Sequence, residues 1–144
     1  MLESIITPNA PESKGHYSQA IRYGNMVFIS GQFPLLPNGD LLKNISLAEE
    51  QILKRDVLLF DEQARQVFRN IEAISQAAGG DLNHIAKLTV YLSASRSNIG
   101  RFSQFNDVMA EVFSHHLPAC SVIGVSSLPE DVDIEIDAIM ILDE

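Results

Sequence analysis

Three carboxylates near the C-terminus have the spacing that points most directly to chemistry. Asp133, Glu135 and Asp137 alternate with apolar residues, and side chains two positions apart in a strand lie on the same face. The pattern therefore predicts a strand with one acidic and one apolar face. Two interpretations of the acidic face stay open: a solvated face at a sheet edge, or a cleft wall in which one carboxylate serves as general acid or base or holds a water molecule. A metal site is disfavoured, because no complete calcium-loop motif and no histidine partner supports one.

Cys120 is the only cysteine of the chain and follows Pro118-Ala119. A lone cysteine is usually a small buried hydrophobic residue, whereas a catalytic cysteine needs a neighbouring base or cation that stabilises its thiolate. The nearest candidates in sequence, His115 and His116, precede Pro118, and this order implies no contact in the fold. We therefore favour a buried hydrophobic role over nucleophilic catalysis.

Two further candidates lie in the N-terminal third of the chain. Gly31, at the end of a predicted strand, either lets a ligand approach backbone amides closely or forms a β-bulge or turn. Tyr17 is either an aromatic residue at the edge of the core or a phenol directed into a pocket. The four histidines show no zinc-ligand spacing, and no glycine-rich phosphate-binding motif is present. The sequence therefore predicts neither a metal nor a cofactor.

Hydrophobic periodicity predicts the elements that position these candidates. They are strands at 20–23 and 26–30 around a turn at 24–25, a helix at 61–78, a strand at 85–92, a helix at 101–114, and strands at 119–126 and 132–142. The order β-β-α-β-α-β-β predicts an α+β fold in which two helices pack on one face of one sheet. Ser46 and Glu49 fit a capping box, which indicates a short helix beginning there.

Composition narrows the class of protein. The chain has 144 residues, 19 acidic against 10 basic side chains and a formal net charge of −9, so a nucleic-acid binder that relies on neutralising phosphates is disfavoured. A length of this order predicts one domain, residues 1–144. The N-terminal residues carry Glu3 and Glu12 and no sustained apolar stretch, so no targeting or membrane segment is predicted. We expect a cytoplasmic protein that acts on a small molecule.

Several segments, taken together and in order, resemble the RidA/YjgF family, also named L-PSP endoribonuclease or translation-inhibitor proteins. The resemblance covers nearly the whole chain, and the combination of motifs is specific although each alone is weak. It is carried by 15–21, 24–34, 63–65, 70–74, 77–79, 87–92, 102–106, Pro118-Ala119 and 128–136.

The resemblance implies a chorismate-mutase-like α+β fold, a homotrimer, and a ligand cleft between adjacent subunits. It also implies hydrolysis of 2-imino acids to 2-keto acids and ammonia, without a cofactor. Matched by position, the family's site tyrosine is Tyr17, its backbone glycine Gly31, its helical asparagine Asn106 and its water-positioning glutamate Glu135.

One family residue is missing. The family's Pro-Ala-Arg-Ser arginine, which grips the substrate carboxylate, is replaced by Cys120. Arginine is always charged and binds a carboxylate with two parallel hydrogen bonds, whereas a thiol supplies no charge. Arg22, Arg96 or Arg101 could replace it from elsewhere in the fold. The connection at 41–60 is also longer than is typical of the family, and could line or cover the cleft.

Three functions stay open. We favour a family member whose cleft between subunits binds a small metabolite, a 2-keto or 2-imino acid or a related compound, without efficient deamination because of Cys120. The alternatives are an active 2-iminobutanoate/2-iminopropanoate deaminase that uses another cation, and a ligand-binding or regulatory trimer without catalysis. The family's ribonuclease name is disfavoured by the net charge.

Overall fold

The computed structural model describes residues 1–42, 55–94 and 101–143, with only the backbone described for 55–59. The proposed helix start at Ser46 and Glu49, and most of the long 41–60 connection, lie outside this part. The elements are β1 (Glu3–Ile5), β2 (Ala20–Tyr23), β3 (Met26–Gln32), α2 (Arg55–Ala77), η1 (Leu82–His84), β4 (Ile85–Ser93), α3 (Arg101–Val112), β5 (Ala119–Val125), η2 (Pro129–Asp131) and β6 (Ile134–Ile141).

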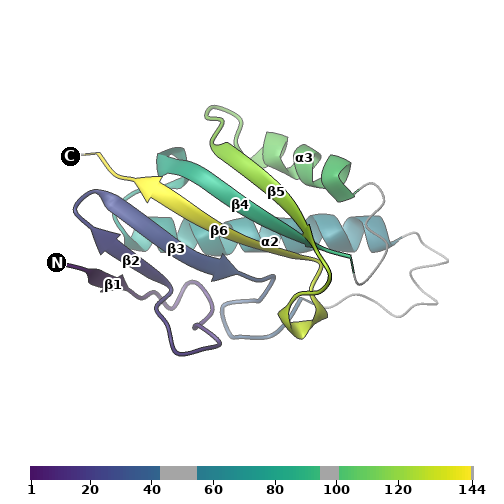
Figure 1. Ribbon diagram of the computed structural model, residues 1–144, viewed down its shortest axis with the longest axis horizontal. Coiled ribbons are helices and arrows are strands. Elements are labelled where there is room, and N and C mark those ends of the chain that lie inside the picture. Colours follow the sequence, from purple (N-terminus) through teal and green to yellow (C-terminus); the bar gives the residue numbers. More distant parts are fainter. Residues whose placement is uncertain (43–54, 95–100, 144) are drawn as a thin grey trace.

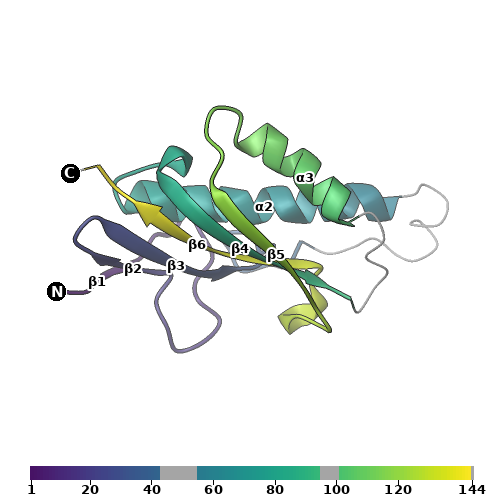
Figure 2. The ribbon, with the colours of Figure 1, turned by 45° about the horizontal axis from the view of Figure 1, so that its top comes forward.

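The strands form one mixed sheet with the order β1-β2-β3-β6-β4-β5. All neighbouring strands are antiparallel except β4 and β5, which are parallel. A parallel pair needs a crossover connection, and α3 supplies it. Both α2 and α3 lie on the same face of the sheet (Figures 1 and 2). The predicted α+β architecture with two helices on one face is confirmed.

The core lies between α2 and the central strands. The predicted apolar stripe of α2 is buried, and the alternating apolar residues of β4 and β6 meet it. Phe68 connects α2 to α3 and to the residue that follows α3. Its ring stacks on Phe105 with the ring centres 6.2 Å apart and meets Phe113 edge-on with the ring centres 5.6 Å apart. The fully or almost fully buried side chains of this core include Ala64, Val67, Ile71, Ile74, Leu88, Val90, Ile134 and Ile136.

Three sequence predictions need correction. Strand β6 lies between β3 and β4 in the middle of the sheet, so its acidic face is not at a sheet edge. Helix α2 begins at Arg55, six residues before the predicted start at 61, because the run 57–60 is apolar throughout and shows no helical period. Strand β1 was not predicted, because three residues are too short to show an alternation.

The sheet face opposite the helices is unusually apolar for an uncovered surface. Phe28 is 44% exposed and Ile141 is 45% exposed, and the pairing of β3 with β6 places Met26 opposite Ile141. Tyr23 and Ile123 are exposed on the same face. No helix among the described segments is long and apolar enough to cross a bilayer.

Candidate functional site

A β-bulge in the middle of the sheet brings Gly31 and Glu135 together. Between Ile29 and Gln32 the pairing of β3 with β6 shifts by one residue, which is the signature of a bulge. The Glu135 carboxylate lies directly against Gly31, where an added Cβ would overlap its Oε2 atom. The bulge interpretation of Gly31 therefore fits, and the group that lies close to the glycine is the side chain of Glu135. Approach of a ligand to the backbone amides at Gly31 stays a prediction.

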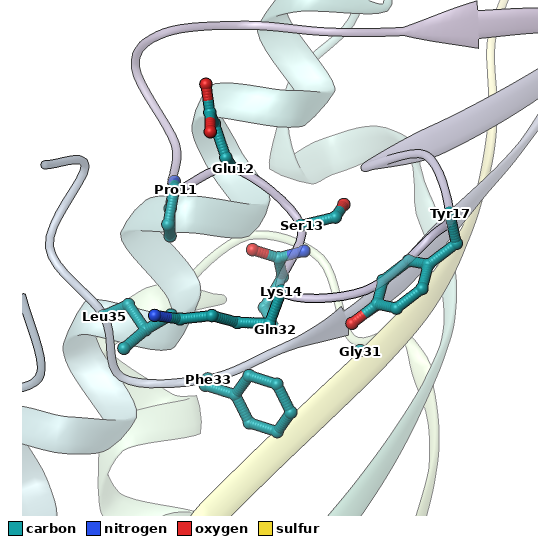
Figure 3. Close-up of a pocket in the computed structure, with 9 residues that line it drawn as sticks. All are labelled: Pro11, Glu12, Ser13, Lys14, Tyr17, Gly31, Gln32, Phe33 and Leu35. Atoms are coloured by element: carbon teal, nitrogen blue, oxygen red, sulfur yellow. The ribbon is translucent and has the colours of Figure 1, made fainter. Parts of the chain in front are cut away.

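Tyr17 approaches the same place from the preceding loop. Its backbone N–H donates to the carbonyl of Gly15 at 2.9 Å, and its ring packs over that glycine, where a Cβ would come within 2.6 Å of the ring edge. Figure 3 shows the Tyr17 hydroxyl directed toward Gly31, and both residues line one pocket. Tyr17 is 52% exposed, and its hydroxyl has no hydrogen-bond partner in the described part of the chain. Of the two interpretations, the phenol directed into a pocket fits.

Gln19 anchors the loop that carries Tyr17. Its buried side-chain amide donates to the carbonyls of Thr7 at 3.1 Å and Pro11 at 2.8 Å, and its oxygen accepts from the Thr7 N–H at 2.7 Å. Ser30 joins the loop to β3, because its hydroxyl donates to the Ser18 carbonyl at 2.7 Å. Sequence reasoning did not identify Gln19 as a positioning residue. A glutamine without a periodic pattern gives no such signal.

The electrostatics favour a basic carboxylate at Glu135. Burial raises the pKa of Glu135 above its ordinary value, and the neighbouring Asp137 carboxylate raises it further. Asp137 lies on the same face of β6 and accepts a hydrogen bond from the Tyr91 hydroxyl at 3.1 Å. A carboxyl group of raised pKa is a better general base than a free carboxylate and can also return the proton.

Asp133 does not share this face, which corrects the prediction of three aligned carboxylates. It precedes the first residue of β6 and is 3% exposed. Its N–H donates to the Gln63 side chain at 3.1 Å, and its carboxylate lies 3.7 Å from the Arg101 guanidinium. The alternation therefore holds for Glu135 and Asp137 alone, because a residue outside the strand does not follow the strand's period.

The described arginines that could have replaced the family arginine have structural roles. Arg101 is 4% exposed, pairs with Asp133, and places its guanidinium 4.8 Å from the centre of the Phe60 ring. Arg22 donates to the carbonyls of Gly24 at 2.8 Å and Ala78 at 3.2 Å, so it satisfies the end of α2. Arg96 lies outside the described residues. Neither Arg22 nor Arg101 lines the pocket at Tyr17 and Gly31.

Cys120 and Asn106 lie on the other side of the sheet. Cys120 pairs with Leu88, whose side chain is fully buried under the helices, so the thiol lies on the helix side of the sheet, at the edge strand β5. Asn106 is exposed on α3. Within one chain, the five predicted site residues therefore form two groups: Tyr17, Gly31 and Glu135 lie together, while these two lie apart from them.

Cys120 is exposed rather than buried, so the expectation of a core cysteine is wrong. Local desolvation raises the pKa of its thiol, and the Lys87 ammonium offsets only part of this effect. Within a single chain, this direction of the pKa shift does not favour the thiolate that a nucleophilic cysteine needs. Lys87 itself donates to the Ser121 hydroxyl at 2.7 Å.

The pocket that Tyr17 and Gly31 share is small and contains a cation that the sequence did not single out. About 10 Å³ of it is open to a water-sized sphere, which is room for one water molecule. Lys14 lines it together with Tyr17 and Gly31 (Figure 3). Lys14 comes three residues before Tyr17, and this short spacing could have identified it as a candidate pocket residue. The direction of its side chain depends on the loop conformation, which the sequence does not show. No cluster of three or more metal-ligating side chains occurs in the described ranges.

Comparison with known proteins places this geometry in a family. A sequence model described as Endoribonuclease L-PSP matches residues 7–142. A RutC family protein of Pyrococcus horikoshii is 44% identical over 139 residues, covering 96% of this chain and 97% of its own. A 2-iminobutanoate/2-iminopropanoate deaminase of Dermatophagoides farinae is 30% identical over 139 residues, covering 96% of this chain and 95% of its own.

Solved structures agree with the sequence relatives. The Rid family protein YyfA of Yersinia pestis superposes with a TM-score of 0.82 at 35% identity, covering 99% of this chain and 100% of its own. TdcF of E. coli, solved with bound serine, gives a TM-score of 0.79 at 32% identity, covering 98% and 99%. With the family model spanning almost the whole sequence, the chain belongs to the RidA/YjgF family, the Endoribonuclease L-PSP family of the matching model.

Proposed function

We propose that this protein is a homotrimer whose clefts between subunits bind a small 2-oxo or 2-imino carboxylic acid. We propose further that it hydrolyses 2-imino acids slowly, because Cys120 supplies no charge for the substrate carboxylate. The observation that carries the proposal is the division of the site residues. Tyr17, Gly31 and Glu135 lie together, whereas Asn106 and Cys120 lie on the opposite side of the same sheet.

A cleft between two copies would reunite the two groups. Within one chain, the pocket that Tyr17 and Gly31 share has room for only one water molecule, so a metabolite beside Gly31 needs a second wall. The apolar sheet face around Phe28 and Ile141 supports assembly, because exposed apolar patches of this kind mark interaction surfaces. In a closed ring of identical subunits, each subunit presents the same face to its neighbours, so this face would be covered in every copy.

The proposed chemistry is addition of water to a carbon–nitrogen double bond. Glu135 takes a proton from a water molecule as the water oxygen bonds to the carbon of a protonated imine. Glu135 then returns that proton to the amino nitrogen. The carbon–nitrogen bond breaks, ammonia leaves, and the hydroxyl proton passes to solvent as the 2-oxo acid forms. Tyr17 and the backbone at Gly31 orient the substrate.

Two relatives support this substrate class. The Dermatophagoides farinae protein is a 2-iminobutanoate/2-iminopropanoate deaminase, and E. coli TdcF binds serine, which also carries a carboxylate beside a nitrogen-bearing carbon. A charge-assisted hydrogen bond contributes about 1.5–3 kcal/mol. Loss of a bidentate arginine therefore weakens substrate binding without removing the groups that perform the hydrolysis.

The test is ammonia release from 2-iminopropanoate generated by an amino-acid oxidase. We expect a slow rate with wild-type protein, a rate at least about tenfold higher with Cys120→Arg, and no acceleration with Glu135→Gln. A wild-type rate equal to that of Glu135→Gln contradicts the deaminase. If such a protein still binds 2-oxobutanoate, it is the ligand-binding trimer of the alternative.

A further inference from the structure

The pocket beside Tyr17 and Gly31 contains one positively charged side chain. Lys14 lies in the loop before Tyr17 and lines the pocket with both residues. In Figure 3 its side chain runs along the pocket toward Leu35, while the Tyr17 hydroxyl lies at the other end, over Gly31. The Lys14 ammonium therefore shares one cavity of one subunit with Tyr17 and Gly31, and the Glu135 carboxylate lies against that same glycine.

No hydrogen bond or ion pair from the described residues holds the Lys14 ammonium where it lies. The side chain is exposed, and it has no hydrogen-bond or ion-pair partner among residues 1–42, 55–94 and 101–143. Lysine has a flexible four-carbon stem, so rotation of the ammonium toward Gly31 breaks no hydrogen bond or ion pair to a described residue. Glu12, which lines the same pocket, is the nearby opposite charge.

Other described cations near the sheet have partners or lie elsewhere. Arg101 is buried against Asp133, and Arg22 is bonded to backbone carbonyls. Lys87 donates to Ser121 and pairs with Ile139, four residues along β6 from Glu135, which is about 13 Å in an extended strand. Lys14 is therefore the cation best placed to meet an anion at Tyr17 and Gly31.

Resting on the proposed function, we propose that the Lys14 ammonium binds the substrate carboxylate in place of the family arginine. The anion-binding group then comes from the subunit that supplies Tyr17, Gly31 and Glu135, and not from β5. A lysine offers a point charge and no planar fork. Carboxylate recognition is consequently retained but is weaker and less directional than with arginine.

The test compares the dissociation constants of 2-oxobutanoate and of butanone, which lacks the carboxylate, measured by NMR titration of the intact protein. We expect Lys14→Met to weaken 2-oxobutanoate binding about tenfold and to leave butanone binding unchanged. Lys14→Arg should preserve 2-oxobutanoate binding. Arg69→Met is the control, because it removes a positive charge from α2, where Arg69 donates to the Gln66 side chain at 3.1 Å, and it should bind like wild type.

Adding Cys120→Arg to Lys14→Met should restore tight 2-oxobutanoate binding, because the family arginine then supplies the charge. Unchanged affinity in Lys14→Met, equal loss for both compounds, or loss only in Arg69→Met each overturns the role of Lys14. Failure of the wild-type protein to bind either compound overturns the proposed function itself. Wild-type binding that Lys14→Met leaves intact overturns only the present inference.

Discussion

The two groups of site residues are built in opposite ways. Tyr17, Gly31 and Glu135 are fixed inside one chain, by a β-bulge and by a loop that Gln19 holds with buried hydrogen bonds. Cys120 lies on an exposed edge strand and Asn106 on an exposed helix face. The first group is preorganised within one chain, whereas the second would meet the first only across the subunit boundary of the proposed trimer. The departure from the family pattern, Cys120, lies in the second group.

Removing the base from the preorganised group should give the largest effect. Glu135→Gln keeps the shape of the side chain but cannot accept a proton, so the rate of 2-iminopropanoate hydrolysis should fall about 10²–10⁴-fold. The rate is measured as ammonia release, and the melting temperature serves as the control. A hydrolysis rate close to that of wild type would place the base elsewhere.

Arg101, which joins α3 to the segment before β6, should affect the stability of the fold more than the rate of hydrolysis. Arg101 begins α3 and pairs with buried Asp133 just before β6, so Arg101→Met leaves a buried carboxylate without that partner. We expect the free energy of unfolding to fall by about 3–5 kcal/mol, measured by denaturant titration. Arg22→Met, at a partly exposed helix end, is the control and should cost about 1 kcal/mol. Equal losses of unfolding free energy in the two variants would show that the buried Arg101–Asp133 pair contributes no more than an exposed contact.

A methyl group at the bulge should lower the rate of hydrolysis with little effect on the stability of the fold. In Gly31→Ala the new Cβ displaces the Glu135 carboxylate. A misplacement of a reacting group by about 1 Å costs about 10²-fold in rate, so the rate of hydrolysis should fall by about that factor. Since the end of a side chain can move, the melting temperature should change little. Gly124→Ala is the matched control, because a Cβ there meets nothing within 4 Å in its own subunit. Full activity in Gly31→Ala would show that the close approach is not needed.

The smallest predicted effect is a shift in pH dependence. Burial and Asp137 raise the pKa of Glu135 above 4.5, so kcat/KM should rise with pH along a limb centred above that value as the base ionises. Asp137→Asn removes the neighbouring charge but keeps an acceptor for Tyr91, so the limb should move to lower pH. A limb that stays in place would mean that Asp137 does not act on Glu135.

Much of the fold could be predicted because its patterns are local. The α2 stripe and the alternation in β6 appear in the sequence because each element buries one face. The predicted start of α2 was six residues too late, because the uninterrupted apolar run 57–60 shows no helical period. Asp133 was wrongly placed on the acidic face of β6, because it lies outside that strand. Gly31 was recognised as a bulge or close approach, but its contact with Glu135 depends on the pairing of β3 with β6, which are far apart in sequence.

The division of the site could not be predicted. Whether Cys120 shares a face with Glu135 depends on the register between β4 and β5 and on the position of β6 in the sheet. These are long-range choices that local periodicity does not encode. Lys14 was overlooked for a similar reason, because the Gln19 hydrogen bonds, and not the local sequence, fix the loop that carries it.

Mixed trimers test the shared cleft most directly. Subunits carrying both Glu135→Gln and Cys120→Arg lack the base but supply the arginine, while wild-type subunits supply the base without it. If the cleft joins residues of two subunits, co-refolded mixtures should release ammonia from 2-iminopropanoate faster than either parent. A rate equal to the weighted sum of the two parents would contradict the shared cleft.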